Sequence, residues 1–210
     1  MSKIVSKKFP SPFTTPVFFS TPIIITILVL LDIQYEEYTF AKEIMTYLLG
    51  PATVALAVPL YKNREIVFKN ILPVGLGLTI GSFSSILSGV LLAKVFGLSN
   101  ILIASISVKS STTPVAIEIS KIIGGDPALT VAFVIITGIA GTMIGPWLMN
   151  LTKITNPLSR GLALGTIAHG QGTAEAAQEG ELQGAVSGVA MGLGAIFTAF
   201  VAPIVISLIL

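Results

Sequence analysis

Long apolar runs constrain the fold of this chain more than any other feature. Continuous runs predict helices, because a helix satisfies its own backbone hydrogen bonds in lipid, whereas a β-barrel needs alternating segments. Soluble domains contain about 25% charged residues, but here 53% of the residues are hydrophobic, 10% are charged and the mean hydropathy is +0.91. A helix that crosses a bilayer needs about 20 residues, and the runs of that kind are 16–33, 44–61, 71–93, 101–123, 128–151, 161–180 and 183–209.

The sequence therefore predicts an all-α protein, a polytopic membrane helical bundle. Short connectors join the runs, so we expect a basic amino-terminal arm at 1–15 and a single transmembrane domain at 16–210. Basic residues favour the cytoplasmic side of a membrane. They cluster before the first run and between the second and third runs, which predicts a cytoplasmic amino terminus: Lys3, Lys7, Lys8, Lys62, Arg64 and Lys69.

One apolar run conflicts with this orientation. If both 101–123 and 128–151 crossed the membrane fully, Lys153 and Arg160 would lie on the outer side, against the preference of basic residues. A re-entrant or broken segment at 101–123 would remove the conflict.

The composition excludes several classes of function. The net charge of +2 comes from basic residues scattered over short connectors, so no nucleic-acid groove is expected. The chain has no cysteine, which excludes disulfides and thiolate metal sites, and His169 is its only histidine. Ser110 and Ser111 lack the spacing of a nucleophile elbow. We therefore expect neither an enzyme nor a protein that holds a metal ion or cofactor.

Two of the apolar runs contain segments that interrupt a helix. In 107–114, Pro114 has no backbone N–H and follows a run of hydroxyl residues that compete for backbone hydrogen bonds. In 165–173, three glycines disfavour a continuous helix. Paired discontinuous helices near the middle of a membrane are typical of a transporter site, so we expect two such helices whose breaks approach each other. The alternative is that Pro and Gly are simply common in membrane helices.

Weaker patterns concern the architecture. The segment 50–59 carries Pro51 and Thr53 in apolar sequence, much as Pro114 stands in the later run, which allows for inverted repeats of an elevator-like kind. Many glycines recur at every fourth residue, a spacing that lets helix backbones approach closely. We interpret these glycines as packing residues: Gly77, Gly81, Gly141, Gly145, Gly161, Gly165, Gly184, Gly188 and Gly192.

Four stretches resemble the signature stretches of a known family in order and spacing. They are 49–60, 109–120, 132–138 and 160–173, and they are similar to those of the LrgB/CidB family over nearly the whole chain. That family is described as bacterial murein-hydrolase regulators, encoded beside small holin-like LrgA/CidA proteins, with a plastid relative that carries glycolate and glycerate. Two departures are Gly170–Gln171, where Ala-Ile is common, and a basic arm where members usually have a further apolar helix, so we expect a shortened amino-terminal region.

The resemblance implies a transporter of small monocarboxylates such as pyruvate or glycolate, coupled to protons, with control of murein hydrolase activity and autolysis as a downstream effect. It also implies a multi-pass protein of the bacterial inner membrane, a homo-oligomer such as a dimer, and an LrgA/CidA-type membrane protein as partner. Two other classes stay open, a holin-like or antiholin-like pore and a regulatory partner that transports no solute. Polar residues gathered at two breaks favour the carrier, because a pore-former is expected to carry a polar stripe along a helix.

Candidate site residues come from the two breaks. Half-helix amino termini attract anions, and threonine hydroxyls can donate hydrogen bonds to a carboxylate. Buried carboxylic acids and imidazole can exchange protons near neutral pH, which makes Glu118, His169 and Glu175 candidates for proton coupling. The alternative is that these groups cap and pair inside the bundle, for example Lys109 with Glu118. The predicted solute-binding residues are Lys109, Ser111, Thr112, Thr113, Pro114, His169, Gly170, Gln171, Gly172 and Thr173.

Overall fold

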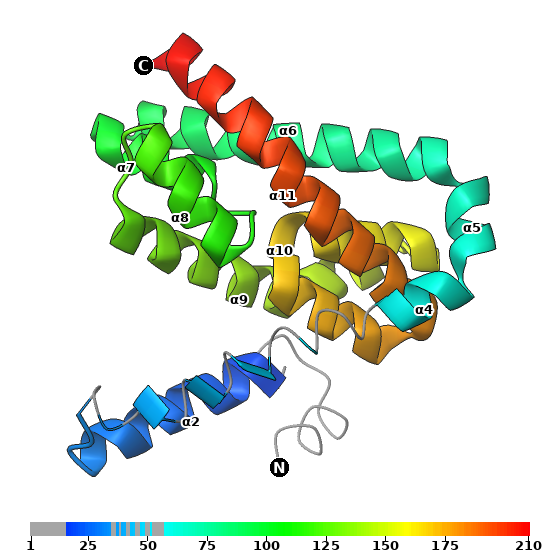
Figure 1. Cartoon of the computed structure of the whole chain (residues 1–210), viewed down its shortest axis with the longest axis horizontal. Coiled ribbons are helices and arrows are strands. Elements are labelled where there is room, and N and C mark those ends of the chain that lie inside the picture. Colours follow the sequence, from blue (N-terminus) through cyan, green and yellow to red (C-terminus); the bar gives the residue numbers. More distant parts are fainter. Residues whose placement is uncertain are drawn as a thin grey trace.

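The computed structural model describes residues 16–34, 37, 39–40, 43–44, 47–48, 51 and 57–210. The basic arm at 1–15 and half of the apolar run 44–61, including most of the 50–59 segment of the suggested repeat, lie outside the described residues. The elements of the described part are helices (Figure 1). They are α2 (Pro16–Leu30), α4 (Ala57–Lys62), α5 (Arg64–Lys69), α6 (Ile71–Val95), α7 (Asn100–Ser107), α8 (Thr113–Ile122), α9 (Pro127–Leu151), α10 (Pro157–Glu179) and α11 (Glu181–Ile209).

The predicted all-α membrane bundle is confirmed. Within the described residues, three helices, α6, α9 and α11, are long and apolar enough to cross a bilayer. The run at 16–33 forms only the 15 residues of α2, fewer than the roughly 20 that a perpendicular crossing requires. The runs at 101–123 and 161–180 form broken elements, so the described part of the chain does not consist of one straight helix per apolar run.

Local signals explain where the long helices begin. Asp126 precedes α9, and its carboxylate accepts a hydrogen bond from the backbone N–H of Leu129 at 2.8 Å. Asn156 caps α10 in the same way through the N–H of Ser159 at 3.2 Å. Both caps are followed by a proline. Proline suits the first helical position, because a backbone N–H at that position would have no intrahelical acceptor.

α10 reverses its direction in the middle. His169 has φ 41° and ψ −124°, which no helix allows. Arg160 and Glu179, near the two ends of α10, form a two-pronged ion pair, with Nε to Oε2 at 2.7 Å and Nη2 to Oε1 at 2.5 Å. In a straight helix these residues would lie about 28 Å apart. α10 is therefore a hairpin of a first arm (157–168) and a second arm (170–179), a reversal that the sequence did not predict (Figure 1).

The pair formed by α7 and α8 also begins and ends at the same end of the bundle. The helix stops at Ser107 and resumes at Thr113, so the break predicted at 107–114 is confirmed. The hydroxyl of Ser105 accepts a hydrogen bond from the backbone N–H of Asp126 at 2.8 Å, although 21 further residues of straight helix would separate them by about 30 Å. The pair α7–α8 is re-entrant, the arrangement that removes the orientation conflict.

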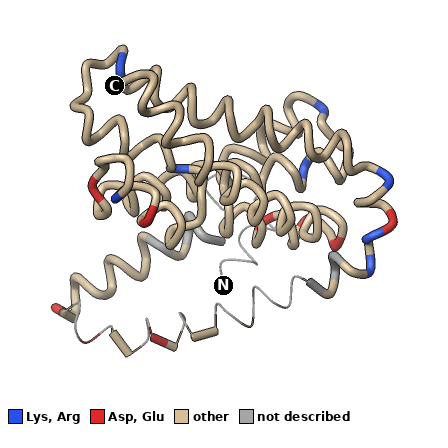
Figure 2. The backbone as a smooth tube through the Cα atoms, turned by 45° about the horizontal axis from the view of Figure 1, so that its top comes forward, with Lys and Arg blue, Asp and Glu red and all other residues tan. Residues whose placement is uncertain are grey.

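The two re-entrant elements enter the bundle from opposite ends. At one end, Lys62 pairs with Glu181 at 3.7 Å, and the base of the α10 hairpin lies beside the end of α9, where Arg160 also donates to the side-chain oxygen of Asn150 at 2.9 Å. At the other end, Lys94 donates to the carbonyl of Ile209 at 2.7 Å. Figure 2 shows most charged residues at these ends and few between them.

Glycines bring the first arm of α10 close to three helices. Side chains of this arm lie where a Cβ would stand on Gly77 and Gly81 of α6 and on Gly141 and Gly145 of α9. A Cβ on Gly161 or Gly165 would collide with the backbone of α11 at Gln183 or Ser187. The packing interpretation of these glycines is confirmed, whereas Gly192 has nothing within 4 Å of its Cβ position.

We expect chemical labelling to find both ends of each re-entrant element on one side of the membrane. The chain has no cysteine of its own, so single substitutions can be labelled with a membrane-impermeant maleimide in oriented vesicles. Lys69→Cys, Thr155→Cys and Gln178→Cys should react from one side, and Phe96→Cys and Ile122→Cys from the other. Labelling of the last two from opposite sides would show that α7–α8 crosses the membrane.

The ion pair at the base of α10 should contribute more stability than a surface pair. Glu179→Gln leaves Arg160, whose side chain is 12% exposed, without its charged partner, and we expect a loss of about 3 kcal/mol in the free energy of unfolding in detergent micelles. Glu118→Gln is the matched control, because the Glu118–Lys121 pair is mostly exposed and should be worth less than about 1 kcal/mol. Equal losses in the two variants would contradict a special role for the base of the hairpin.

Candidate functional site

The first break places a lysine inside the bundle without a carboxylate. Lys109 follows the last turn of α7 and reaches α6, where its Nζ donates to the carbonyl of Ser85 at 2.6 Å and lies 3.0 Å from the Ser85 hydroxyl. The hydroxyls of Ser85 and Ser110 are 2.8 Å apart. Gly89 leaves room for the lysine, since a Cβ there would lie 3.0 Å from Nζ. These neutral partners leave the positive charge of Lys109 uncompensated.

The second break is held by α9. The Nε2 of His169 lies 3.1 Å from the carbonyl oxygen of Val134, which can only accept, so Nε2 carries the proton in this bond. Gly138, one turn further along α9, leaves space for Gln171, whose Oε1 lies 2.7 Å from the position of a Cβ on that glycine. Thr173 donates to the carbonyl of His169 at 2.9 Å and accepts from Ser187 at 3.1 Å. The hydroxyl of Thr173 therefore links the backbone at the break to Ser187 of α11.

Shared neighbours show how the two breaks are related in space. Ser110 bonds Ser85 of α6, while Thr166, three residues before His169, has its methyl 3.3 Å from the Cβ position of Gly81, one turn away on the same helix. On α9, Val134 packs in the same apolar cluster as Val108 and offers its carbonyl to His169. Both breaks thus reach the middle portions of α6 and α9.

Several buried polar atoms near the breaks have no hydrogen-bond partner. Buried polar groups are nearly always paired with protein or water, so each exception needs an explanation. Within the described residues, such atoms lie in the first break, in the second break and on the part of α6 between Gly81 and Ser85. They are Ser82 Oγ, Ser111 Oγ, Thr166 Oγ1 and Gln171 Oε1. Unpaired oxygens in this part of the bundle fit a site that binds a polar solute or ion.

The other predicted solute-binding residues lie around these groups. Thr112 precedes α8 in an extended conformation and makes no side-chain capping bond, and Thr113 and Pro114 open the helix. Gly170 is exposed beyond the break. A Cβ on Gly172 would collide with the carbonyl of Leu164 on the opposite arm, so this glycine allows the two arms to pack together.

The two acidic candidates for proton coupling, Glu118 and Glu175, have different surroundings in the structure. Glu118 is exposed and pairs with Lys121 at 2.7 Å, so the predicted pair between Glu118 and Lys109 does not form and this carboxylate lies outside the buried site. The cause is helical spacing, because α8 turns position 118 away from the buried face that carries Ala116 and Ile119. Glu175 is half-buried on the second arm of α10 and remains beside the break.

Sequence reasoning missed the partners that other helices supply. Ser82 and Ser85 of α6, the carbonyl of Val134 and the hydroxyl of Thr166 complete the surroundings of the breaks. Serine and threonine within an apolar helix usually bond their own backbone, so their presence gave no signal. A backbone carbonyl gives none either.

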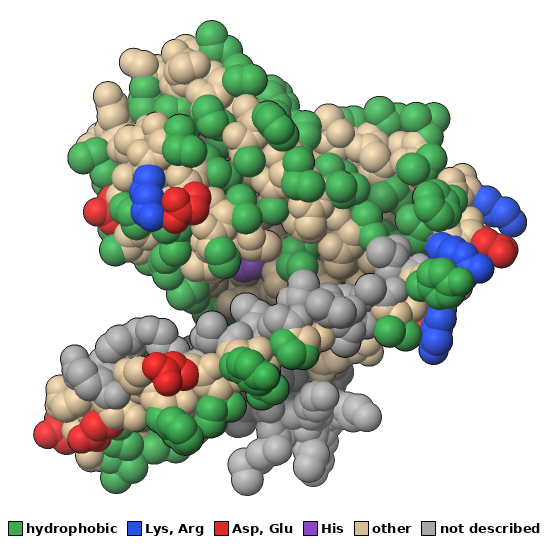
Figure 3. Space-filling view, in the orientation of Figure 1, with side chains coloured by type: hydrophobic (Ala, Val, Ile, Leu, Met, Phe, Trp, Pro, Cys, Tyr) green, Lys and Arg blue, Asp and Glu red, His purple; other side chains and the backbone are tan. Residues whose placement is uncertain are grey.

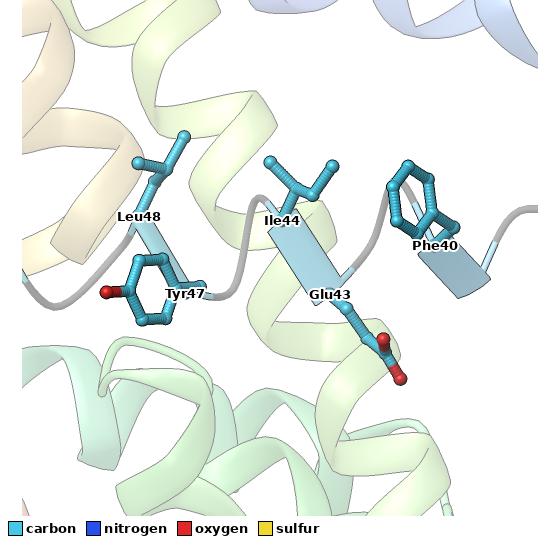
Figure 4. A pocket seen from close by; sticks show the side chains of 5 residues that line it. All are labelled: Phe40, Glu43, Ile44, Tyr47 and Leu48. Carbon is cyan, nitrogen blue, oxygen red and sulfur yellow. The ribbon is translucent and has the colours of Figure 1, made fainter.

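The predicted site is distinct from a hollow elsewhere on the protein. Figure 3 shows the histidine at the edge of the hollow between the bundle and the segment that carries α2, although only 6% of His169 is exposed. The hollow in Figure 4 is lined by residues of a single segment and contains none of the predicted site residues. Its lining is Phe40, Glu43, Ile44, Tyr47 and Leu48.

The chemistry of the breaks suits an anion better than a transition metal. No group of three or more His, Cys, Asp or Glu residues within the described part of the chain could hold a metal ion. Lys109 provides a positive charge, Ser110 and Ser111 provide hydroxyls, and the amino-terminal end of α8 starts beside them. Helix amino termini favour negative charge.

Comparison with known proteins assigns the family. The chain matches the LrgB-like family over residues 1–208. It is 41% identical to YxaC of Bacillus subtilis (strain 168) over 95% of this chain and 87% of that protein, and 39% identical to YwbG of the same strain over 98% and 92%. It is 32% identical to the holin-like protein CidB of Staphylococcus aureus (strain N315) over 99% and 90%. No solved structure matches. The chain belongs to the LrgB-like family.

Proposed function

We propose that this protein is a carrier of small monocarboxylates, such as pyruvate or glycolate, and not an enzyme. The observation that supports it most directly is Lys109, whose Nζ lies at the level of the middle of α6 with only serine oxygens as partners. A charge at membrane depth is expensive unless it is paired. A bound carboxylate would supply the missing negative charge and remove that cost.

We assign each group a role in this proposal. The solute carboxylate would lie against Lys109, the hydroxyl of Ser111 and the amino-terminal end of α8. Gln171 would meet the rest of the solute, because its Oε1 is buried and free to accept a hydrogen bond. A single uncompensated cation matches a monoanion, whereas a dianion would leave one negative charge unpaired.

Two re-entrant elements also provide a route for alternating access. α7–α8 enters from one end of the bundle and the α10 hairpin from the other. A site between the tips of two such elements can be exposed to either side when one element moves against the rest. Glu175 and His169 lie in the α10 hairpin and are the titratable groups through which protons would be coupled to this movement.

A holin-like pore is the second candidate, and the name of the Staphylococcus aureus relative, holin-like protein CidB, favours it. A pore would pass solutes without saturation, whereas a carrier saturates.

The family resemblance further supports a bacterial inner-membrane location with a cytoplasmic amino terminus, a homo-oligomer such as a dimer, an LrgA/CidA-type partner, and an effect on murein hydrolases and autolysis. These expectations are the same whether the protein is a carrier or a pore.

Flux measurements in proteoliposomes test the carrier directly. Purified protein should give saturable uptake of labelled pyruvate or glycolate. Lys109→Met removes the charged hydrogen-bond donor, worth about 1.5–3 kcal/mol, so we expect KM to rise at least about tenfold. Lys121→Met is the matched control, because Lys121 is exposed and pairs with Glu118 outside the site, and its KM should not change.

A second pair of variants keeps this test informative if Lys109→Met fails to fold. Ser111→Ala removes a buried hydroxyl without a partner, while Ser107→Ala removes one that is equally buried but bonded to the carbonyl of Ala104. Raised KM in Ser111→Ala alone supports solute contact at the first break. Flux that never saturates in the unmodified protein would favour the pore.

Coupling to protons should depend on the second arm of α10. Glu175→Gln keeps the shape and hydrogen bonding of the side chain but cannot carry a proton. We expect uptake by this variant to lose its dependence on an imposed pH gradient while exchange of labelled for unlabelled solute continues. Glu118→Gln is the control and should stay gradient-dependent. If Glu175→Gln responds to the gradient like the unmodified protein, Glu175 does not carry the coupled proton.

A further inference from the structure

Two buried hydroxyls between α6 and α10 lack the hydrogen bond to their own helix that several other helical hydroxyls make. Thr79, Thr142 and Thr198 each bond the carbonyl of the residue four positions earlier in their own helix. Ser82 is 4% exposed and Thr166 is 5% exposed, yet their oxygens have no hydrogen-bond partner. Their lone pairs are therefore available inside the bundle, at a cost in stability unless something occupies the space beside them.

The two hydroxyls lie where three helices cross. The methyl of Thr166 stands 3.3 Å from the Cβ position of Gly81, the residue that precedes Ser82 on α6. The Ser82 oxygen lies 3.7 Å from the Cβ position of Gly194 on α11. Gly194 of α11 thus leaves room beside the Ser82 oxygen, and Gly81 of α6 admits the methyl of Thr166 against the neighbouring turn. Neither hydroxyl belongs to the groups to which we assign the solute carboxylate.

The end of the first arm of α10 adds oxygen atoms of its own. This arm stops before His169, and the last four carbonyls of a helix have no intrahelical partner and carry a partial negative charge. Thr166 lies within that last turn. Hydroxyl and carbonyl oxygens without nitrogen, sulfur or carboxylate ligands suit a hard cation of low charge. The carboxyl-terminal ends of half-helices coordinate sodium in broken-helix transporters.

We propose that Ser82, Thr166 and the carbonyl end of the first α10 arm form a sodium site that is separate from the carboxylate site. Its existence does not depend on the proposed function, but its role in transport does. Ser82 and Ser85 are three residues apart and therefore neighbours on one face of α6, and Ser85 holds the Nζ of Lys109. A sodium ion at Ser82 would be repelled by that ammonium group. A carboxylate bound at Lys109 relieves the repulsion, so sodium and carboxylate load together.

Thermal unfolding of the purified full chain in detergent tests the site without any transport. Sodium chloride, compared with potassium chloride and choline chloride at equal ionic strength, should raise the midpoint temperature by about 2–4 °C. Glycolate should increase the sodium effect, and sodium should increase the glycolate effect by the same factor in binding constant, as linkage requires.

Variants assign the effect to the two hydroxyls. Ser82→Ala and Thr166→Val should unfold in choline chloride no earlier than the unmodified protein, because neither hydroxyl has a partner to lose, and both should lose the sodium effect. Ser84→Ala, an exposed serine on the same helix, and Thr142→Val, a buried threonine bonded to its own helix, should keep it. An equal response to all three salts, or a sodium effect that persists in both site variants, overturns the proposal and leaves water as the occupant.

The flux assay separates this inference from the proposed function. Saturable carboxylate uptake without any response to sodium would support the carrier and overturn the sodium site's role. Stabilisation by sodium that depends on Ser82 and Thr166, in a protein that gives no saturable flux, would support the site and overturn the carrier.

Discussion

The ion pair between Arg160 and Glu179 closes the base of the α10 hairpin, and the path of that hairpin sets which polar groups meet inside the bundle. Because both ends of α10 are held at one end of the bundle, its break at His169 is driven between α6, α9 and α11. A straight helix of the same sequence would have passed through the bilayer and separated its polar residues by depth. The reversal instead concentrates them at one level, opposite the break between α7 and α8.

The interruptions could be predicted from sequence, but the reversals could not. Pro114 and the glycines around residue 170 mark backbone that a helix tolerates poorly, and both breaks occur there. Whether a broken helix continues or turns back depends on a contact between distant residues, such as Arg160 with Glu179. Nothing in a local pattern distinguishes that glutamate from Glu175, four residues earlier. The fold class followed from apolar run length, whereas the connectivity needed the tertiary contacts.

Only some residues of the candidate site could be predicted from the sequence. The breaks themselves supplied Lys109, His169 and Gln171, because charged and amide groups are conspicuous in apolar sequence. Ser82, Ser85 and Thr166 gave no such signal, since hydroxyls in membrane helices usually bond their own backbone. Glu118 lies away from the buried groups for a geometric reason: a helix of ten residues turns some of its side chains outward whatever their distance from the break.

The reversal of α10 also bears on how the protein is made. Chains are synthesised from the amino terminus, so α10 reaches the membrane before α11 exists, and lipid cannot satisfy the backbone groups left open at the break. Gly161 and Gly165 of the first arm have their nearest neighbours on α11. The packing of the hairpin is therefore complete only when the helix that follows it is in place. The 29 residues of α11, together with the broken helix, complete the interior.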